Sequence, residues 1–188
     1  MTDEMLPDTP HHRYFLAKEG HWRGKIRFEL TDRRGLRASS LRPADQWTLK
    51  TLSLASRLSG LVLRTTVDCR ADPNKVLHTT CVTNWGIPVY RSAETIFLVK
   101  DGHTFRVEGR ESFFPFFRSA DWAASGAVAT DYDGATYTIP CFGLTMEQRT
   151  RMTAEGLVIT QITEFSQAII LLKWQRPLDS RPAADQVK

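Results

Sequence analysis

The chain has 188 residues, a formal net charge of +4 and a hydrophobic fraction of 41%. This length suits one domain with a sizeable core, and the composition is ordinary for a globular protein. No run approaches the roughly 20 apolar residues of a membrane-spanning helix, and residues 1–4 lack the basic and then apolar pattern of a secretory signal. These features predict a cytoplasmic protein without an integral membrane span.

Cysteine usage and the distribution of basic residues argue against two further classes. Cys69, Cys81 and Cys141 stand alone, which favours reduced thiols over a disulfide framework. A nucleic-acid surface needs a continuous basic face with interleaved aromatic side chains. The densest basic group surrounds a single turn and consists of Arg33, Arg34, Arg37 and Arg42. We therefore expect no nucleic-acid partner.

The first predicted element is a helix over residues 10–19. Thr9 can cap it, Pro10 suits its first position, and Gly20 suits its exit. Apolar and charged residues then alternate up to Leu30, as in a strand with one buried face.

A short helix followed by Gly20-x-Trp22-x-Gly24 on the first strand resembles the lipocalin and wider calycin superfamily, and the extended motif is similar to that of intracellular calycins. The resemblance implies an up-and-down barrel whose closed end is plugged by the tryptophan. It also implies a cation near the last strand that lies across the indole ring and is attracted by its quadrupole. Arg176 or Lys173 would be that cation here. Gly24 would let another backbone approach closely, as barrel closure requires.

Residues 36–60 carry two conflicting patterns. Helical spacing relates Trp47, Leu54, Leu58 and Leu61, with Gly60 as a stop. Residues 50–54 instead alternate as in a strand. We expect a strand-like or partly helical segment that covers one opening of the barrel.

Strand patterns joined by turn sequences, the clearest being Asp101-Gly102, fill the rest of the chain. The predicted strands cover residues 61–68, 76–85, 90–99, 103–111, 125–132, 135–142, 145–152, 157–163 and 165–174. They predict an all-β fold, an antiparallel up-and-down calycin-like barrel of about 8–10 strands with a short N-terminal helix. A sandwich is the alternative. The barrel would span residues 10–177, with disordered tails at 1–9 and 178–188.

A barrel of this size can hold one small ligand if its interior side chains are not all large. Small or polar residues at predicted interior positions include Thr65, Ala127 and Ala129. The aromatic run at residues 113–117 could line the barrel mouth or dip into a membrane, although such runs more often plug a core. The candidate ligand-binding residues are Trp85, Phe105, Phe114, Tyr137 and Gln148.

His78, Tyr90 and Glu94 are the candidate catalytic residues, because they can move protons and come from strands that can converge. Period two does not show which side of the strands at 76–84 and 90–99 faces inward. The five histidines have no metal-ligand spacing, so we expect no metal and no cofactor.

The calycin resemblance includes two ligand-binding groups whose key residues this chain lacks. Haem binders of the nitrobindin type hold iron with a histidine near the chain end, and residues 157–176 contain none, although His78 or His103 could substitute. Fatty-acid binders hold a carboxylate with a buried arginine, and residues 165–174 contain no arginine.

These patterns favour an intracellular lipocalin-like protein that binds a small hydrophobic or amphipathic molecule in the barrel cavity. The alternative is a cofactor-free isomerase or cyclase, similar to the pericyclases and cyclases among intracellular calycins, that acts on an apolar biosynthetic intermediate there. A third possibility is a filled barrel that acts through its surface.

Overall fold

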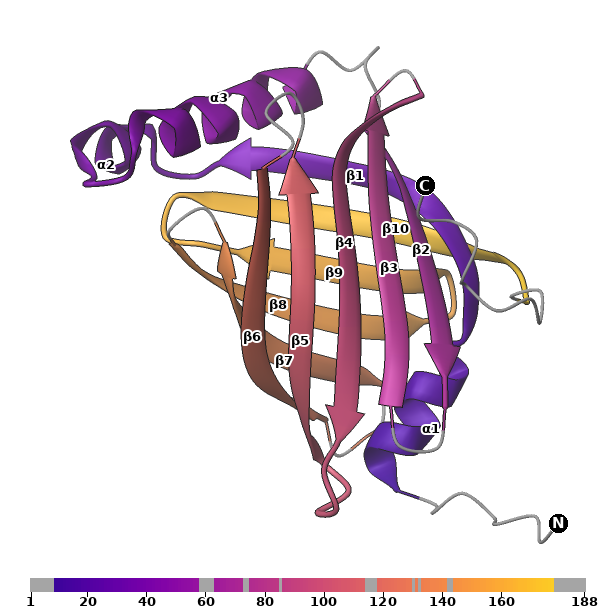
Figure 1. Cartoon of the computed structure of the whole chain (residues 1–188). Coiled ribbons are helices and arrows are strands. Elements are labelled where there is room, and N and C mark those ends of the chain that lie inside the picture. Colours follow the sequence, from indigo (N-terminus) through magenta and orange to yellow (C-terminus); the bar gives the residue numbers. More distant parts are fainter. Residues whose placement is uncertain are drawn as a thin grey trace, which may run out of the picture.

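A computed structural model describes residues 9–57, 63–72, 75–84, 86–113, 118–129, 131, 133–141 and 144–177. These residues form a closed, antiparallel, up-and-down barrel of ten strands with one short helix at the N-terminus (Figure 1). The predicted barrel is thus confirmed, and the sandwich alternative is wrong. The predicted tails lie outside the described residues, except for Thr9.

Three helices accompany the barrel in the described part of the chain. They are α1 (Pro10–Ala17), α2 (Arg33–Ala38) and α3 (Pro43–Arg57). The strands are β1 (Gly20–Leu30), β2 (Arg64–Ala71), β3 (Lys75–Asn84), β4 (Ile87–Leu98), β5 (Thr104–Phe113), β6 (Arg118–Val128), β7 (Gly134–Cys141), β8 (Leu144–Thr153), β9 (Gly156–Ile162) and β10 (Ser166–Arg176). In Figure 1, β2–β6 run upright in front, whereas β1 and β8–β10 cross steeply behind them. The interior therefore lies between two halves of one continuous sheet.

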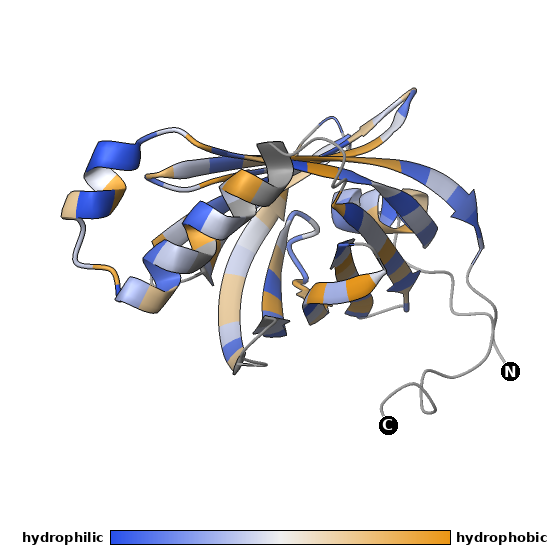
Figure 2. Ribbon diagram, turned by 90° about the horizontal axis from the view of Figure 1, so that it is seen from above, coloured by the Kyte–Doolittle hydropathy of each residue, from blue (hydrophilic) through white to orange (hydrophobic). Residues whose placement is uncertain are grey.

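Hydropathy alternates along the strands, as Figure 2 shows. In β8, Met146, Gln148 and Thr150 are buried while their neighbours are more exposed, which confirms the predicted phase of that strand. The phase predicted for β6 is wrong, because Ala127 and Ala129 are exposed. β6 begins earlier than predicted and buries large residues on its inner face instead. The hydropathy of the alanines did not indicate which face of the strand points inward.

Helix α1 covers one end of the barrel and fills it. Tyr14 and Phe15 are fully or almost fully buried, and the Phe15 ring meets the Phe105 ring edge-on with centroids 5.5 Å apart. Phe105 in turn meets Tyr137 at 5.6 Å. Thr9 precedes the helix as predicted, but its hydroxyl bonds the His11 ring instead of capping the backbone.

Helices α2 and α3 lie at the opposite end, where α3 crosses the barrel rim (Figure 1). The strand-like alternative for residues 50–54 is therefore wrong. Asp32, predicted within a turn, caps α2 by accepting hydrogen bonds from the backbone N–H groups of Arg34 and Gly35. Leu49 of α3 is buried with Phe28 in one apolar cluster. This cluster fastens α3 over the opening.

β1 closes the barrel by pairing with both β2 and β10. Gly24 lies opposite Leu172 of β10 and Thr65 of β2. A Cβ atom at Gly24 would lie 1.7 Å from the Leu171 carbonyl oxygen, so only glycine fits between these backbones. The close approach predicted from the motif is confirmed.

β6 and β7 form the shortest seam of the barrel. Among the described residues, the pairs are Gly126 with Tyr137, Ala127 with Thr136 and Val128 with Ala135. Residues 118–125 of β6 pair with β5 but not with β7. The backbone ladder between these two strands therefore ends after this short run.

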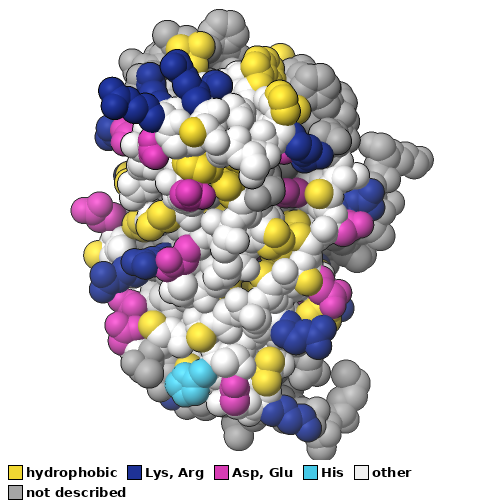
Figure 3. Space-filling model, turned by 90° about the vertical axis from the view of Figure 1, so that its left-hand side faces the viewer, with side chains coloured by type: hydrophobic (Ala, Val, Ile, Leu, Met, Phe, Trp, Pro, Cys, Tyr) yellow, Lys and Arg dark blue, Asp and Glu magenta, His cyan; other side chains and the backbone are white. Residues whose placement is uncertain are grey.

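The outer surface mixes both signs of charge. Figure 3 shows Lys and Arg side chains interspersed with Asp and Glu over one face, and a denser basic group near its upper end. The arginines of α2 are exposed. None of the helices in the described ranges is long and apolar enough to cross a membrane.

Candidate functional site

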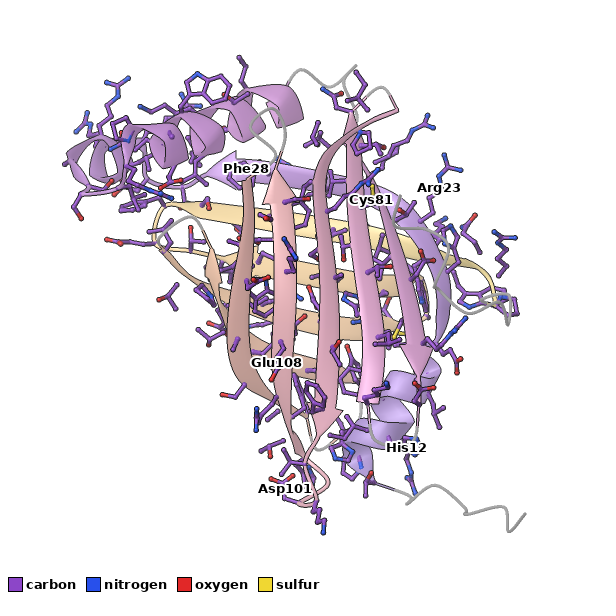
Figure 4. All side chains as sticks on the ribbon, viewed as in Figure 1. His12, Arg23, Phe28, Cys81, Asp101 and Glu108 are labelled. Atoms are coloured by element: carbon purple, nitrogen blue, oxygen red, sulfur yellow. The ribbon has the colours of Figure 1, made fainter. Side chains whose placement is uncertain are left out.

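A cavity of about 340 Å³ lies inside the barrel, on the α3 side of the core that α1 closes. Phe28, which lines it, lies beneath α3, whereas His12 and Asp101 mark the opposite end (Figure 4). Trp47 of α3 also lines the cavity and is 51% exposed, so the cavity reaches the surface beside α3.

The lining is divided between apolar and polar side chains. Apolar side chains come mainly from β1 and from β7–β10, and include Ile26, Phe28, Ile139, Met146, Ile159, Ala168 and Ile170. β3, β4 and β5 contribute the polar residues His78, Thr80, Asn84, Tyr90, Ser92, Glu94 and Glu111. The apolar side also carries polar residues, namely Gln148, Gln161, Thr163 and Ser166, so polar groups are most numerous on β3–β5 but not confined to them.

Strand register explains why these polar groups meet. His78 lies opposite Glu94, and Thr80 lies opposite Ser92, which lies opposite Glu111. Directly opposed residues of antiparallel strands point to the same face of the sheet. The sequence did not show which side of β3 and β4 faces inward. The structure shows that it is the side that carries His78 and Glu94.

His78 and Glu94 form a buried hydrogen bond. Their Nδ1 and Oε2 atoms are 2.9 Å apart, and the Ser92 hydroxyl donates to the other carboxylate oxygen at 3.2 Å. Both side chains are almost fully buried. An ionised carboxylate accepts only, so His78 carries its proton on Nδ1 and leaves the Nε2 lone pair available.

The electrostatic surroundings keep His78 neutral and Glu94 ionised. Burial lowers the pKa of His78, and the Lys18 ammonium lowers it further. Burial alone would raise the pKa of Glu94, but His78, the hydrogen bonds and Lys18 together hold this pKa below its usual value. Lys18 is itself buried at the end of α1, with its Nζ 6.0 Å from the centroid of the Tyr14 ring.

Glu111 is the second carboxyl group of the cavity. Burial and the neighbouring Glu94 raise its pKa from an ordinary value of 4.5 to about 7, although a hydrogen bond with Tyr90 acts in the opposite direction. At neutral pH a large part of the population therefore carries a protonated Glu111. The cavity holds a proton acceptor, His78, and a proton donor, Glu111, under the same conditions.

Three lining residues have buried polar atoms without a hydrogen-bond partner in the described part of the chain. These atoms are His78 Nε2, Asn84 Oδ1 and Trp122 Nε1. The first two accept and the indole N–H donates. Buried polar atoms are nearly always partnered in folded proteins, so these three lining residues are exceptions.

Most of the sequence-predicted site residues meet at this cavity. His78, Tyr90, Glu94 and Gln148 line it. Gln148 donates to the Tyr137 hydroxyl and accepts from Gln161 at 2.6 Å. Tyr137 and Phe105 lie below the cavity, in the core that packs against α1. Trp85 and Phe114 lie outside the described residues.

The motif residues belong to the closed end. Trp22 is buried and its indole N–H donates to the Lys18 carbonyl at 2.8 Å. Gly20 begins β1 with φ of 130°. Arg176 is exposed and lies opposite His21 in the β1–β10 register. The contact between Arg176 and the Trp22 ring stays a prediction.

The site also contains residues that were not predicted, among them Lys18, Asn84, Ser92, Glu111 and Trp122. Glu111 continues the period-two series of the inward Phe105 and Val107, and that phase was a usable signal. Ser92 shares the phase of Glu94. Lys18 lies at the polar end of the predicted helix, where a lysine is normally exposed. Trp122 lies outside all of the predicted strands.

No group of three His, Cys, Asp or Glu side chains suited to a metal ion occurs in the described ranges. The described thiols, Cys69 and Cys81, are free. Burial raises the pKa of the Cys69 thiol to about 11.

Comparison with known proteins gives no family or relative: no protein-family model matches the sequence, and no curated protein matches it significantly.

Proposed function

We propose that the protein binds a small amphipathic molecule inside the barrel. The observation that carries this proposal is the cavity lining, which is largely apolar and includes three residues with an unpartnered buried polar atom, two acceptors and one donor. Ligand sites are typically concave and apolar, with a few polar groups that fix orientation. The polar group of the ligand lies near His78, and its apolar part lies against the apolar side chains of β1 and β7–β10.

The barrel and its N-terminal helix also support the proposed kinship with lipocalins and calycins, in particular the intracellular ones. That kinship, the cytoplasmic location and the lack of a nucleic-acid partner remain predictions from the sequence.

The first test is native mass spectrometry of the purified protein, followed by organic extraction and identification of the released compound. A stoichiometric amphipathic compound supports the proposal. Haem would contradict the expectation that no cofactor is bound.

A second test uses the fluorescent amphipathic probe anilinonaphthalene sulfonate with two matched variants. Ala168 lines the cavity, whereas its neighbour Ile169 points outward on the same strand. We expect Ala168→Phe to fill space in the cavity and weaken probe binding at least about tenfold, a loss of about 1.4 kcal/mol. Ile169→Phe should bind as the native protein does. Equal binding by both variants, or none by the native protein, would favour a filled barrel that acts through its surface.

A second candidate function is a cofactor-free isomerase or cyclase acting in the same cavity. The His78–Glu94 contact favours it, because a pure binding site has no need of a buried imidazole held in one tautomer by a carboxylate.

A further inference from the structure

The polar wall of the cavity contains the parts of an acid–base pair. His78 is a neutral imidazole whose free nitrogen, Nε2, is buried and unpartnered among the residues that the structure describes. Glu111 lines the same cavity. Groups whose surroundings push their pKa values apart in this way are the usual acid and base of an enzyme.

The spacing of the two side chains leaves room for a reacting group. His78 on β3 is opposite Glu94 on β4, and Glu94 is opposite Gly109 on β5. Glu111 is therefore two strands away from His78 and two residues further along β5, on the same inward face. With strands about 4.8 Å apart and about 3.4 Å of rise per residue, their Cα atoms lie on the order of 10 Å apart. Side chains that reach inward from both positions can contact opposite ends of a carbonyl-containing fragment.

We propose that the protein isomerises a small β,γ-unsaturated ketone, with His78 Nε2 removing a proton from the carbon beside the carbonyl group and Glu111 donating a proton to the carbonyl oxygen. This inference rests on the proposed binding function and gives it a substrate class. It concerns proton transfer only and therefore needs no oxidant, reductant or second substrate.

The steps balance. The electron pair of the broken C–H bond forms a new carbon–carbon double bond, and the carbonyl π pair moves to oxygen, which takes the Glu111 proton. Glu111 then recovers that proton as the carbonyl re-forms, and the γ-carbon takes the proton held on His78. One C–H bond has been broken and one formed, and the double bond now lies in conjugation with the carbonyl.

Neighbouring residues have supporting roles in this scheme. Glu94 is a positioning residue, because it keeps the His78 proton on Nδ1 and thus the lone pair on Nε2. The unpartnered Trp122 indole N–H can donate a second hydrogen bond to the same oxygen, which is a carbonyl oxygen in the substrate and an enol oxygen in the intermediate. Other titratable groups surround the pair: Lys18 and Asp68 act electrostatically on His78, Cys69 and Tyr137 interact with Glu94, and Tyr90 forms a hydrogen bond with Glu111.

The test incubates the protein with isomesityl oxide and with a straight-chain β,γ-unsaturated decenone. The conjugated product is followed by its ultraviolet absorbance, and ketone binding is measured separately by ligand-observed NMR. We expect catalysis above the buffer rate that falls at least about 100-fold in His78→Gln, the usual contribution of a general base. Imidazole added to His78→Ala should restore part of it.

The pH profile separates a catalytic role of Glu111 from a structural one. Native activity should fall as the pH rises above about 7, where Glu111 loses its proton. Glu111→Gln should be slower by about 10-fold or more and should lack this alkaline decline. Glu94→Gln should lose activity and shift the acidic limb. Glu108→Gln, on the outer face of β5, should behave as the native protein does.

The outcomes distinguish this inference from the binding proposal. Ketones that bind but are not isomerised overturn the inference and leave the binding function standing, as does full activity in His78→Gln. Failure to bind either ketone also overturns the inference. If anilinonaphthalene sulfonate fails to bind as well, the binding function falls with it.

Discussion

At the scale of single residues, Glu111 couples the cavity to the stability of the fold. Its carboxyl group is buried beside Glu94, and its pKa in the folded protein is about 7, above the ordinary 4.5. Between these two pH values the folded state binds more protons at this site than the unfolded state does. Stability therefore decreases as the pH rises through this window.

We expect Glu111→Gln to remove that decrease, because an amide has no charge to bury. At pH about 8.5 the variant should be more stable than the native protein by on the order of 2 kcal/mol, or about 4–8 °C in melting temperature. Near pH 5 the difference should be small. Thermal denaturation at both pH values measures it, with Glu108→Gln as the control. A native protein that is equally stable at both pH values, with no gain in the variant, would contradict a raised pKa at Glu111.

The residues of the polar wall show how far single positions could be predicted. His78, Tyr90, Glu94 and Gln148 were proposed for their chemistry and all line the cavity. The pairing of His78 with Glu94 could not be predicted, because it depends on the register of two strands whose faces are both mixed. Register is fixed by contacts around the whole barrel, and these are not visible in a local pattern.

At the scale of elements, α3 forms part of the cavity wall on the side where the cavity reaches the surface. Leu49 is 1% exposed and inserts among Phe28, Leu36 and Phe165, whereas Leu54 on the same helix is 58% exposed. Helical spacing predicted α3 from Trp47 and Leu54, but Leu54 is exposed and Trp47, at the edge of the cavity, is still 51% exposed. Which face of this helix is buried depends on where the helix contacts the barrel rim, and here Leu49 makes that contact.

Leu49→Ala should loosen α3 from the barrel. We expect a loss of about 2–4 kcal/mol, the usual cost of truncating a buried leucine, and faster release of a bound probe. Leu54→Ala on the exposed face should change stability by less than about 0.5 kcal/mol. Denaturant unfolding and stopped-flow release of anilinonaphthalene sulfonate measure both. Unchanged release from Leu49→Ala would show that ligands do not leave past α3.

At the scale of the whole molecule, the barrel depends on the closure between β1 and β10. Gly24 sits where the β10 backbone comes nearest, so a methyl group there forces the two strands apart. Gly24→Ala should lower stability by about 2–3 kcal/mol and the melting temperature by about 5–10 °C. Lys25→Ala, whose side chain is exposed, is the matched control. Differential scanning calorimetry compares them, and a Gly24→Ala variant as stable as Lys25→Ala would refute the proposed close approach.

The overall architecture was the most predictable level. Alternation in β1 and β8, the Asp101-Gly102 turn and the glycine at position 24 each agree with a barrel, and the structure confirms them. The prediction failed in β6, because small residues of similar hydropathy lie on both of its faces and do not indicate which face points inward. The strand-like alternative for residues 50–54 was wrong for a related reason, since a run of five residues can fit either a helical or a strand period.

The short β6–β7 seam is a place where the barrel wall can open locally. Trp122 of β6 and Ile139 of β7 line the cavity on either side of it, in the stretch where the two strands no longer pair. Local opening is easiest where few backbone hydrogen bonds must break. Amide hydrogens of residues 118–125 that point away from β5 should therefore exchange with deuterated solvent sooner than those of β3 and β4. β3 and β4, which carry His78 and Glu94, are paired with a neighbouring strand on both sides, so local opening at this seam leaves these two residues in place.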